Sequence, residues 1–153
     1  MRIAVSCDHA GFSAKATVLE TIRSAGHEAI DLGTLGPEPP VDYPDQAWLV
    51  TDAILAGRAE RGVVLCGSGV GAAIAANKVP GIRAGVCHDT YSAHQAVEHD
   101  DMNVLALGAR VIGPELIAAA VREFVGARFM ASVPRYVRRL DKVNALERKL
   151  RGK

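Results

Sequence analysis

The sequence predicts an α/β fold, a doubly wound three-layer sandwich with a five-stranded parallel sheet and an extra C-terminal helix. Short β-branched runs alternate five times with longer Ala- and Leu-rich segments, which is the strand–helix repeat of such folds. Several short runs are almost continuously apolar, as is typical of strands buried on both faces of a parallel sheet. The length of 153 residues suits one domain, since domains usually run about 100–200 residues.

Each expected strand is followed by a segment of helix length. The strands cover 3–7, 28–32, 62–66, 84–87 and 103–107, and the helices cover 11–25, 44–57, 69–78, 89–98 and 114–127. Gly26 and Pro114 are well placed as the end of the first helix and the first turn of the fifth. In the first helix, 3–4 spacing predicts an apolar face formed by Phe12, Ala16, Leu19, Ile22 and Arg23.

Two further segments stand outside this repeat. The loop at 33–44 holds four prolines and is long for such a connection, so we expect it to overhang a site. A sixth helical pattern, at 136–150, follows the last strand and is not needed as a crossover. It either packs on its own domain or docks on a second subunit, and its apolar residues recur every 3–4 positions, at Tyr136, Leu140, Val143, Leu146 and Leu150.

Charge and composition exclude several classes of protein. The net charge of +1 argues against a dedicated nucleic-acid binder, but it conceals a basic tail of +6 at 135–153 and a remainder of −5 at 1–134. No apolar run approaches the length of a membrane span, and the start is too short for a signal peptide. Three cysteines without a C-x-x-C pair suggest free thiols in a reducing cytoplasm. We therefore expect a cytoplasmic protein without membrane or nucleic-acid partners.

Polar, titratable and glycine residues gather where the expected strands end. In open parallel sheets ligands bind beyond the carboxyl ends of the strands. The first strand ends at Asp8 and His9, the third runs into a glycine turn at 66–71, and the fifth leads through Gly108 to Arg110. This convergence predicts an active site at that edge of the sheet.

The GSGVG segment at 67–71 is the strongest local signal. Glycines allow a tight turn that exposes backbone N–H groups, and before a helix such a turn binds anions. It is not a Walker A loop, because no Gly-Lys-Ser/Thr follows. Gly67, Gly69 and Ala72, with Asp89 further on, partly match a dinucleotide-binding fingerprint, though in the third strand–helix unit instead of the first. A turn kept only for packing is the third interpretation.

Cys66 directly precedes this turn. A thiol at a helix N-terminus can become a reactive thiolate, so Cys66 is a candidate nucleophile or base. The alternative is a small buried residue at a strand end, which is the better interpretation of Cys7 and Cys87. Asp89 is expected to cap a helix, and no spacing of Cys and His supports a zinc site. Arg135 and Arg139 share a helical face and could fork onto one phosphate, or form a solvated basic face.

Five segments together resemble the ribose-5-phosphate isomerase B family, which also holds the galactose-6-phosphate isomerase subunits. They are CDHAG at 7–11, VDYPD at 41–45, CGSGVGAAIAANKVPGIRA at 66–84, CHDTYSA at 87–93 and NVLALGARVIG at 103–113. The likeness runs over about residues 2–148. It implies a Rossmann-like sandwich of five parallel strands, a homodimer or dimer of dimers with shared active sites, and no metal or nucleotide cofactor.

The resemblance also implies an activity. It is the interconversion of an aldose and a ketose phosphate, typically ribose 5-phosphate and ribulose 5-phosphate of the pentose phosphate pathway. A four- or six-carbon sugar phosphate is the alternative, and a nucleotide-binding module is less favoured. By this resemblance Cys66 is the base that moves a proton between C1 and C2 through a cis-enediolate, whose charge is held by backbone N–H groups of the turn at Gly67, Gly69, Val70 and Gly71.

The same resemblance assigns the remaining site residues. His99 matches the histidine that opens the furanose ring, and Ser68 the hydroxyl near the substrate oxygens. Asp8 and Tyr43 match positions that hold sugar hydroxyls or assist ring opening. The phosphate positions are His9, Arg110, Arg135 and Arg139. In the family the C-terminal arginines reach into the neighbour's site, so the domain at 1–134 and the basic helix at 135–153 are expected to be one domain whose helix packs on a second subunit.

Two positions depart from variants of the family pattern. One branch of the family replaces the cysteine by a glutamate just after the glycine turn; here that position is Ala72 and Cys66 is present. The cysteine mechanism is therefore the consistent one. Many members carry asparagine where this chain has Asp100, which is expected to contact the substrate and to affect which sugar is preferred. A carboxylate beside His99 favours its imidazolium form.

Overall fold

The computed structural model describes residues 1–151, with side chains through Lys149, and has the predicted α/β fold. Gly152 and Lys153, and the side chains of Leu150 and Arg151, were counted in the predicted basic tail or helix and lie outside the described residues. The strands are Arg2–Cys7 (β1), Glu28–Asp31 (β2), Arg61–Cys66 (β3), Ala84–Val86 (β4) and Val104–Gly108 (β5). All pair in parallel, in the order β2-β1-β3-β5-β4.

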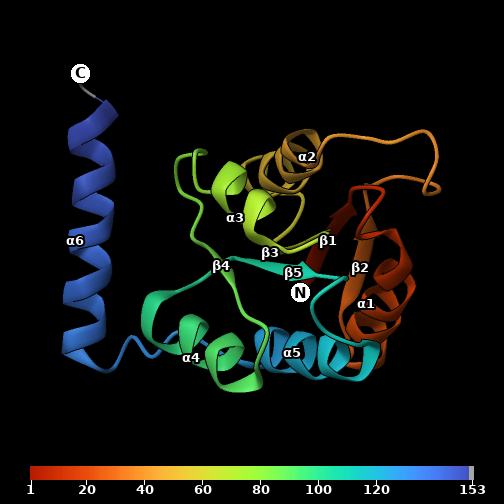
Figure 1. The fold of residues 1–153 in the computed structure, drawn as a ribbon. Coiled ribbons are helices and arrows are strands. Elements are labelled where there is room, and N and C mark those ends of the chain that lie inside the picture. Colours follow the sequence, from red (N-terminus) through yellow and green to blue (C-terminus); the bar gives the residue numbers. More distant parts are fainter. Residues whose placement is uncertain (152–153) are drawn as a thin grey trace.

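Helices cover both faces of this sheet. They are Phe12–Ser24 (α1), Tyr43–Leu55 (α2), Val70–Ala76 (α3), Thr90–Asp100 (α4), Pro114–Gly126 (α5) and Pro134–Arg151 (α6). Figure 1 shows α2 and α3 on one face and α1, α4 and α5 on the other, which is the doubly wound arrangement expected from right-handed crossovers. The expected element order is confirmed, and most boundaries fall within two residues of the prediction.

The alternation of side chains along each strand builds two hydrophobic cores. In β3, Val63 and Leu65 point into the larger core beneath α1, α4 and α5, whereas Val64 and Cys66 point into the smaller core beneath α2 and α3. Both cores exclude solvent, which explains why the strands read as continuous apolar runs. The face that a strand residue occupies therefore also decides the surroundings of its side chain at the end of the strand.

The apolar face expected for the first helix is partly wrong. Ala16 and Arg23 are exposed, and the helix instead buries Lys15 and Val18. A lysine can take this position because its aliphatic stem packs as an apolar group while its ammonium finds partners. A periodicity count that scores Lys15 as polar therefore rotates the buried face away from its true direction.

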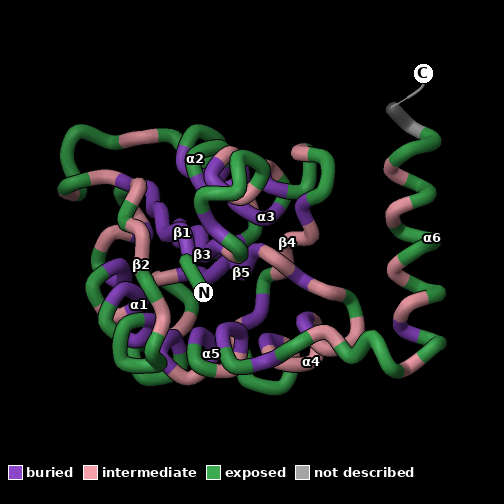
Figure 2. The backbone as a smooth tube through the Cα atoms, turned by 180° about the vertical axis from the view of Figure 1, so that it is seen from behind, coloured by how far each residue is buried: buried purple, intermediate pink, exposed green. Residues whose placement is uncertain are grey.

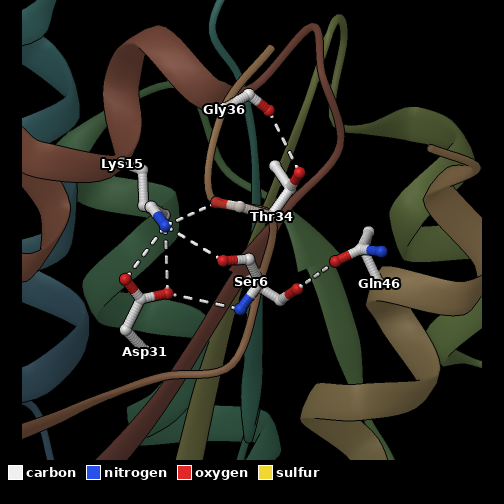
Figure 3. A network of polar contacts seen from close by, with 7 residues as sticks. Ser6, Lys15, Asp31, Thr34, Gly36 and Gln46 are labelled. Atoms are coloured by element: carbon white, nitrogen blue, oxygen red, sulfur yellow. Dashed lines mark hydrogen bonds and ion pairs between the residues drawn. The ribbon is translucent and has the colours of Figure 1, made fainter. Parts of the chain in front are cut away.

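The ammonium of Lys15 ties the loop after β2 to α1 (Figure 3). Its Nζ lies 2.9 Å from the Asp31 carboxylate and donates to the carbonyls of Gly33, at 3.0 Å, and Thr34, at 2.7 Å. On the other side of the same loop, the buried Ser6 hydroxyl donates to Gln46 Oε1 at 2.7 Å. These contacts fix the start of the segment that leads to Tyr43.

Helix α6 stands apart from the sandwich. Figures 1 and 2 show it beside the edge formed by β4 and α4, with few buried positions along its length. Tyr136 is buried at its start, but Val143 and Leu146 are 51% and 63% exposed. A groove of about 670 Å³ lies between α6, the end of α4 and the 77–85 segment. In one chain the apolar stripe predicted for this helix is thus largely uncovered.

No helix in the described part of the chain combines the length and apolar character needed to cross a membrane.

Replacing Lys15 by methionine should destabilise the fold markedly. The substitution keeps the stem but removes the ammonium from two carbonyls and from the Asp31 carboxylate, which keeps the Gly33 N–H as a donor. Breaking a buried ion pair costs about 3–5 kcal/mol, and a lost buried hydrogen bond about 1–3 kcal/mol. Because the Asp31 side chain is 35% exposed, we expect a loss of about 2–3 kcal/mol in the free energy of unfolding by urea.

The matched control is Arg58→Met, since Arg58 pairs with Asp52 at 2.6 Å on the surface. Exposed pairs contribute less than about 1 kcal/mol, so this variant should unfold close to the wild-type midpoint. Equal losses in the two variants would contradict the role given to the buried ammonium.

Candidate active site

The glycine turn begins at the buried sulfur of Cys66, the last residue of β3. The Gly69 N–H donates to Cys66 Sγ at 3.0 Å, so an N–H dipole points at the sulfur and stabilises negative charge there. Gly69 has φ +81°, a left-handed conformation that favours glycine. The Ser68 hydroxyl oxygen accepts from the Val70 N–H at 3.3 Å, which leaves its own hydrogen free to donate to a ligand.

The turn is packed against the end of β5. The N–H groups of Ala109 and Arg110 each donate at 3.0 Å to the carbonyls of Cys66 and Gly67. A methyl group on Gly108 would lie 2.6 Å from the Ser68 carbonyl carbon, so only glycine allows this approach. The predicted anion cradle is therefore a rigid backbone surface held by its neighbour strand, and α3 behind it has only 7 residues.

Side chains from three other segments surround this turn. A methyl on Gly71 would lie 2.9 Å from Tyr43 Cζ, so the phenol ring covers the turn. Arg110 passes over Gly67, with its Cδ 3.6 Å from where a Cβ would lie. Asp8 is buried after β1 and accepts from the Gly11 N–H at 2.8 Å. The structure thus brings these predicted residues together.

His9 belongs to the same edge, and its ring is oriented by the proline-rich loop. Its Nδ1 donates to the Val41 carbonyl at 3.1 Å, which leaves Nε2 free on an exposed ring. The proline-rich loop lies against this edge through Val41 and Tyr43, and its role over an active site stays a prediction. We call the set at this edge the thiol half-site; it comprises Asp8, His9, Tyr43, the turn at 66–71 and Arg110.

The other two cysteines differ chemically from Cys66. Cys7 and Cys87 point into the larger core, on the opposite face of the sheet from Cys66. Burial raises the pKa of each of these two thiols to about 11. Both therefore stay protonated near neutral pH, as the interpretation of these residues as inert strand ends requires.

His99 lies away from the thiol half-site in the fold. It is the penultimate residue of α4 and is close in sequence to Asp101, whose carboxylate pairs with Arg83 at 2.7 Å. Arg83 immediately precedes β4, so this is the amino edge of the sheet. Within one chain His99 is therefore far from the edge occupied by His9, because the 11-residue helix spans about 15 Å between the two edges.

Two side chains contact His99 at this amino edge of the sheet. Its ring stacks on Tyr136 of α6, with centroids 4.0 Å apart, and its Nδ1 lies 2.6 Å from Gln95 Nε2. The adjacent Arg135 is exposed and donates to the Tyr136 hydroxyl at 2.9 Å. Asp100 and Arg139 are exposed nearby on α4 and α6. We call this set the imidazole half-site; it comprises Gln95, His99, Asp100, Arg135, Tyr136 and Arg139.

Three residues of structural importance were missed by sequence reasoning. His88 Nε2 accepts from the Gly108 N–H at 2.9 Å and so fixes the strand that supports the turn. Gln95 and Tyr136 touch His99; the spacing of Gln95 and His99, four apart on a helix, was the available signal for the first.

Asp89 caps α4 as predicted, accepting from the Ser92 N–H at 2.7 Å. Among the described residues, no three His, Cys, Asp or Glu side chains are arranged to hold a metal ion.

Comparison with known proteins places the chain among the sugar-phosphate isomerases, the class that the motif resemblance implied. Residues 3–143 match the model of the ribose/galactose isomerase family, and the chain belongs to that family. The chain is 41% identical to ribose-5-phosphate isomerase B of Escherichia coli strain K12 over 148 residues, 97% of each protein. The resemblance inferred from the motifs is thereby confirmed.

Two further relatives mark the range of the family. D-erythrulose-4-phosphate isomerase of Pectobacterium atrosepticum is 43% identical over 131 residues, which is 84% of this chain and 85% of that protein. The solved structure of Clostridium thermocellum ribose-5-phosphate isomerase B superposes with a TM-score of 0.92 at 43% identity, covering 98% of this chain and 99% of that one. The fold is shared in full, whereas relatives of similar identity act on different sugars.

Alkylation should distinguish the three thiols. At pH 7.5 a thiol with a pKa of about 11 is well under 0.1% thiolate, so Cys7 and Cys87 should react very slowly with iodoacetamide. Cys66, at the turn and facing the Gly69 N–H, should be labelled first. Peptide mass mapping over a time course measures the order, and equal labelling of all three cysteines would contradict it.

Proposed function

We propose that this protein interconverts ribose 5-phosphate and ribulose 5-phosphate, with Cys66 as the base. The observation that carries the proposal is the sulfur of Cys66 at the start of a glycine turn whose Gly69 N–H points at it. The thiolate takes the proton from C2 of the open-chain aldose and returns it to C1. A proton moves from O2 to O1 in the same interval, so the aldehyde becomes the ketone without net redox change.

The intermediate is a cis-enediolate, which carries negative charge on its oxygens. Backbone donors of the turn at Gly67, Gly69, Val70 and Gly71 stabilise that charge, and the Ser68 hydroxyl donates to the same oxygens. Each preorganised donor of this kind is typically worth about 2.7–4 kcal/mol in the barrier. The tight packing of Gly108 on Ser68 supports this role, since rigid donors need no reorganisation during the reaction.

We further propose that each active site is shared between two chains in a homodimer. The thiol half-site and the imidazole half-site lie at opposite edges of one sheet, yet the reaction needs both a base and a ring-opening acid. Helix α6 supports the proposal, because it leaves Val143 and Leu146 exposed beside the imidazole half-site. Val70 and Ile74 of α3, beside the thiol half-site, are likewise 50% and 58% exposed.

In this arrangement the phosphate is held by cations from both chains. His9 and Arg110 come from the thiol half-site, and Arg135 and Arg139 from the partner's helix. Asp8 and Tyr43 hold the sugar hydroxyls. Asp100 contacts the substrate from the imidazole half-site of the other chain, next to His99. The sugar ring opens when His99 protonates the ring oxygen O4 and the O1 proton passes to Asp8. A four-carbon 4-phosphate has no furanose form, so a ring-opening histidine favours the five-carbon substrate.

Removing the base should abolish turnover. We expect Cys66→Ala to lower kcat about 10²–10⁴-fold, the usual contribution of a general base, while the thermal midpoint stays near wild type. The assay is isomerisation of ribose, erythrose, allose and galactose phosphates side by side. Cys87→Ala, a cysteine at the same edge but on the other face, is the control and should keep wild-type kcat.

The outcome of the panel decides the proposal. Wild-type kcat in the Cys66 variant would exclude the thiol as base, and a preference for another sugar phosphate would reassign the substrate while keeping the chemistry.

A mixture of two inactive variants should regain activity if sites are shared. In a heterodimer of Cys66→Ala and His99→Asn chains, one site carries both changes and the other carries neither. Random reassortment of equal amounts should therefore restore roughly a quarter of wild-type activity, as expected for a two-fold symmetric dimer. Activity no greater than the parents' after verified mixing, by native mass spectrometry, would mean that each site lies within one chain.

A further inference from the structure

The ring of His99 is held by two contacts that the reaction itself does not account for. Gln95, four residues earlier on α4, places its amide nitrogen 2.6 Å from His99 Nδ1. Tyr136 stacks on the imidazole at 4.0 Å between centroids and 22° between planes. The first contact sets the rotation of the ring and the second sets its plane, so His99 has a single orientation.

We propose that Gln95 is a positioning residue for ring opening, which reserves Nε2 of His99 for the substrate. The inference rests on the proposed function. With the amide nitrogen of Gln95 facing the ring, its N–H donates to the lone pair of Nδ1, so the neutral ring carries its proton on Nε2. After a half-turn of the amide, its carbonyl oxygen accepts from Nδ1–H of the imidazolium. In both protonation states Nδ1 is paired with the protein.

Nε2 is therefore the nitrogen that exchanges a proton with the sugar. When the C1–O4 bond of the furanose breaks, its electron pair stays on O4, which takes the proton from Nε2 of the imidazolium. The O1–H electron pair forms the C1=O bond, and that proton passes to the Asp8 carboxylate of the same shared site. The neutral ring that remains keeps its Gln95 contact and is ready to be protonated again.

A neutral amide suits this cycle better than a carboxylate would. A carboxylate beside Nδ1 holds a histidine in its charged form and adds an anion near a phosphorylated substrate. Two acidic side chains near this ring, Glu98 of α4 and Glu123 of α5, contact His94 instead, at 3.2 Å and 2.7 Å. His94 thus pairs with the acidic residues, and Gln95 remains the partner of His99.

The test separates ring opening from proton transfer. Ribulose 5-phosphate is acyclic, because O5 carries the phosphate and closure through O4 would give a four-membered ring. Exchange of its C1 hydrogen with D2O, followed by proton NMR, needs the base and the enediolate but no ring opening. We expect Gln95→Met to lower kcat/KM for ribose 5-phosphate at least tenfold, while C1 exchange stays within twofold of wild type.

Two comparison variants sharpen the result. Gln95→Glu keeps an acceptor for Nδ1–H but adds a carboxylate, so it should lower the turnover of ribose 5-phosphate less than Gln95→Met does. His94→Gln changes the adjacent residue on the same helix without touching His99, and should leave both rates unchanged. A 15N-resolved spectrum should show the neutral His99 protonated on Nε2 in wild type, and a mixture of tautomers in Gln95→Met.

Each other outcome overturns the proposal. Equal losses of turnover and exchange in Gln95→Met would show that the residue supports the structure only, and no loss in either would show that it does nothing for His99. Wild-type protein that neither turns over nor exchanges these sugars would remove the proposed function, and this inference with it. Normal wild-type rates with an unaffected variant would remove this inference alone.

Discussion

In a sheet of parallel strands, every connecting helix must run from the carboxyl edge back to the amino edge. This one constraint governs the distribution of functional groups in the protein. Residues at or just after the ends of strands, such as Cys66 and Arg110, collect at one edge. A residue at the end of a helix, such as His99, is carried to the other edge. No change of side-chain rotamer can close a separation of about 15 Å, so the fold itself supports a site completed by a second copy.

The same constraint explains why backbone groups take such a large part in the thiol half-site. At the carboxyl edge the chain must leave β3, turn and begin α3 within a few residues, beside the equally tight exit from β5. Gly69 and Gly108 allow these two exits to touch, and His88 ties the second one down. The Gly69 N–H that faces the sulfur is thus fixed by strand packing and not by flexible side chains. A donor array built in this way loses little free energy to reorganisation when charge develops.

The sequence was sufficient for the element order and for the convergence of strand ends at one sheet edge, because each depends on local signals. Tyr43 was assigned to that edge only by the family resemblance. Apolar runs locate strands, glycines locate turns, and parallel strands align their carboxyl ends. The buried face of α1 could not be found in this way, since Lys15 is polar by type yet buried by virtue of Asp31 and two loop carbonyls. The contact of Tyr136 with His99 was equally inaccessible, because it joins two helices through a loop whose path periodicity does not encode.

The charge asymmetry of the chain acquires a physical reason from this geometry. In the proposed reaction the sugar phosphate brings about −1.5 to −2 charges, as phosphate monoesters do, and the enediolate adds another. Against this the thiol half-site offers Arg110 and His9, while Asp8, and Cys66 as the base of the proposed mechanism, add negative charge to its own side. Residues 135–149 carry six basic and two acidic side chains, and the body at 1–134 is acidic overall. A basic helix that docks on the acidic body of a second copy would therefore be attracted to the surface where its arginines are needed, because complementary charge both steers association and fixes its register.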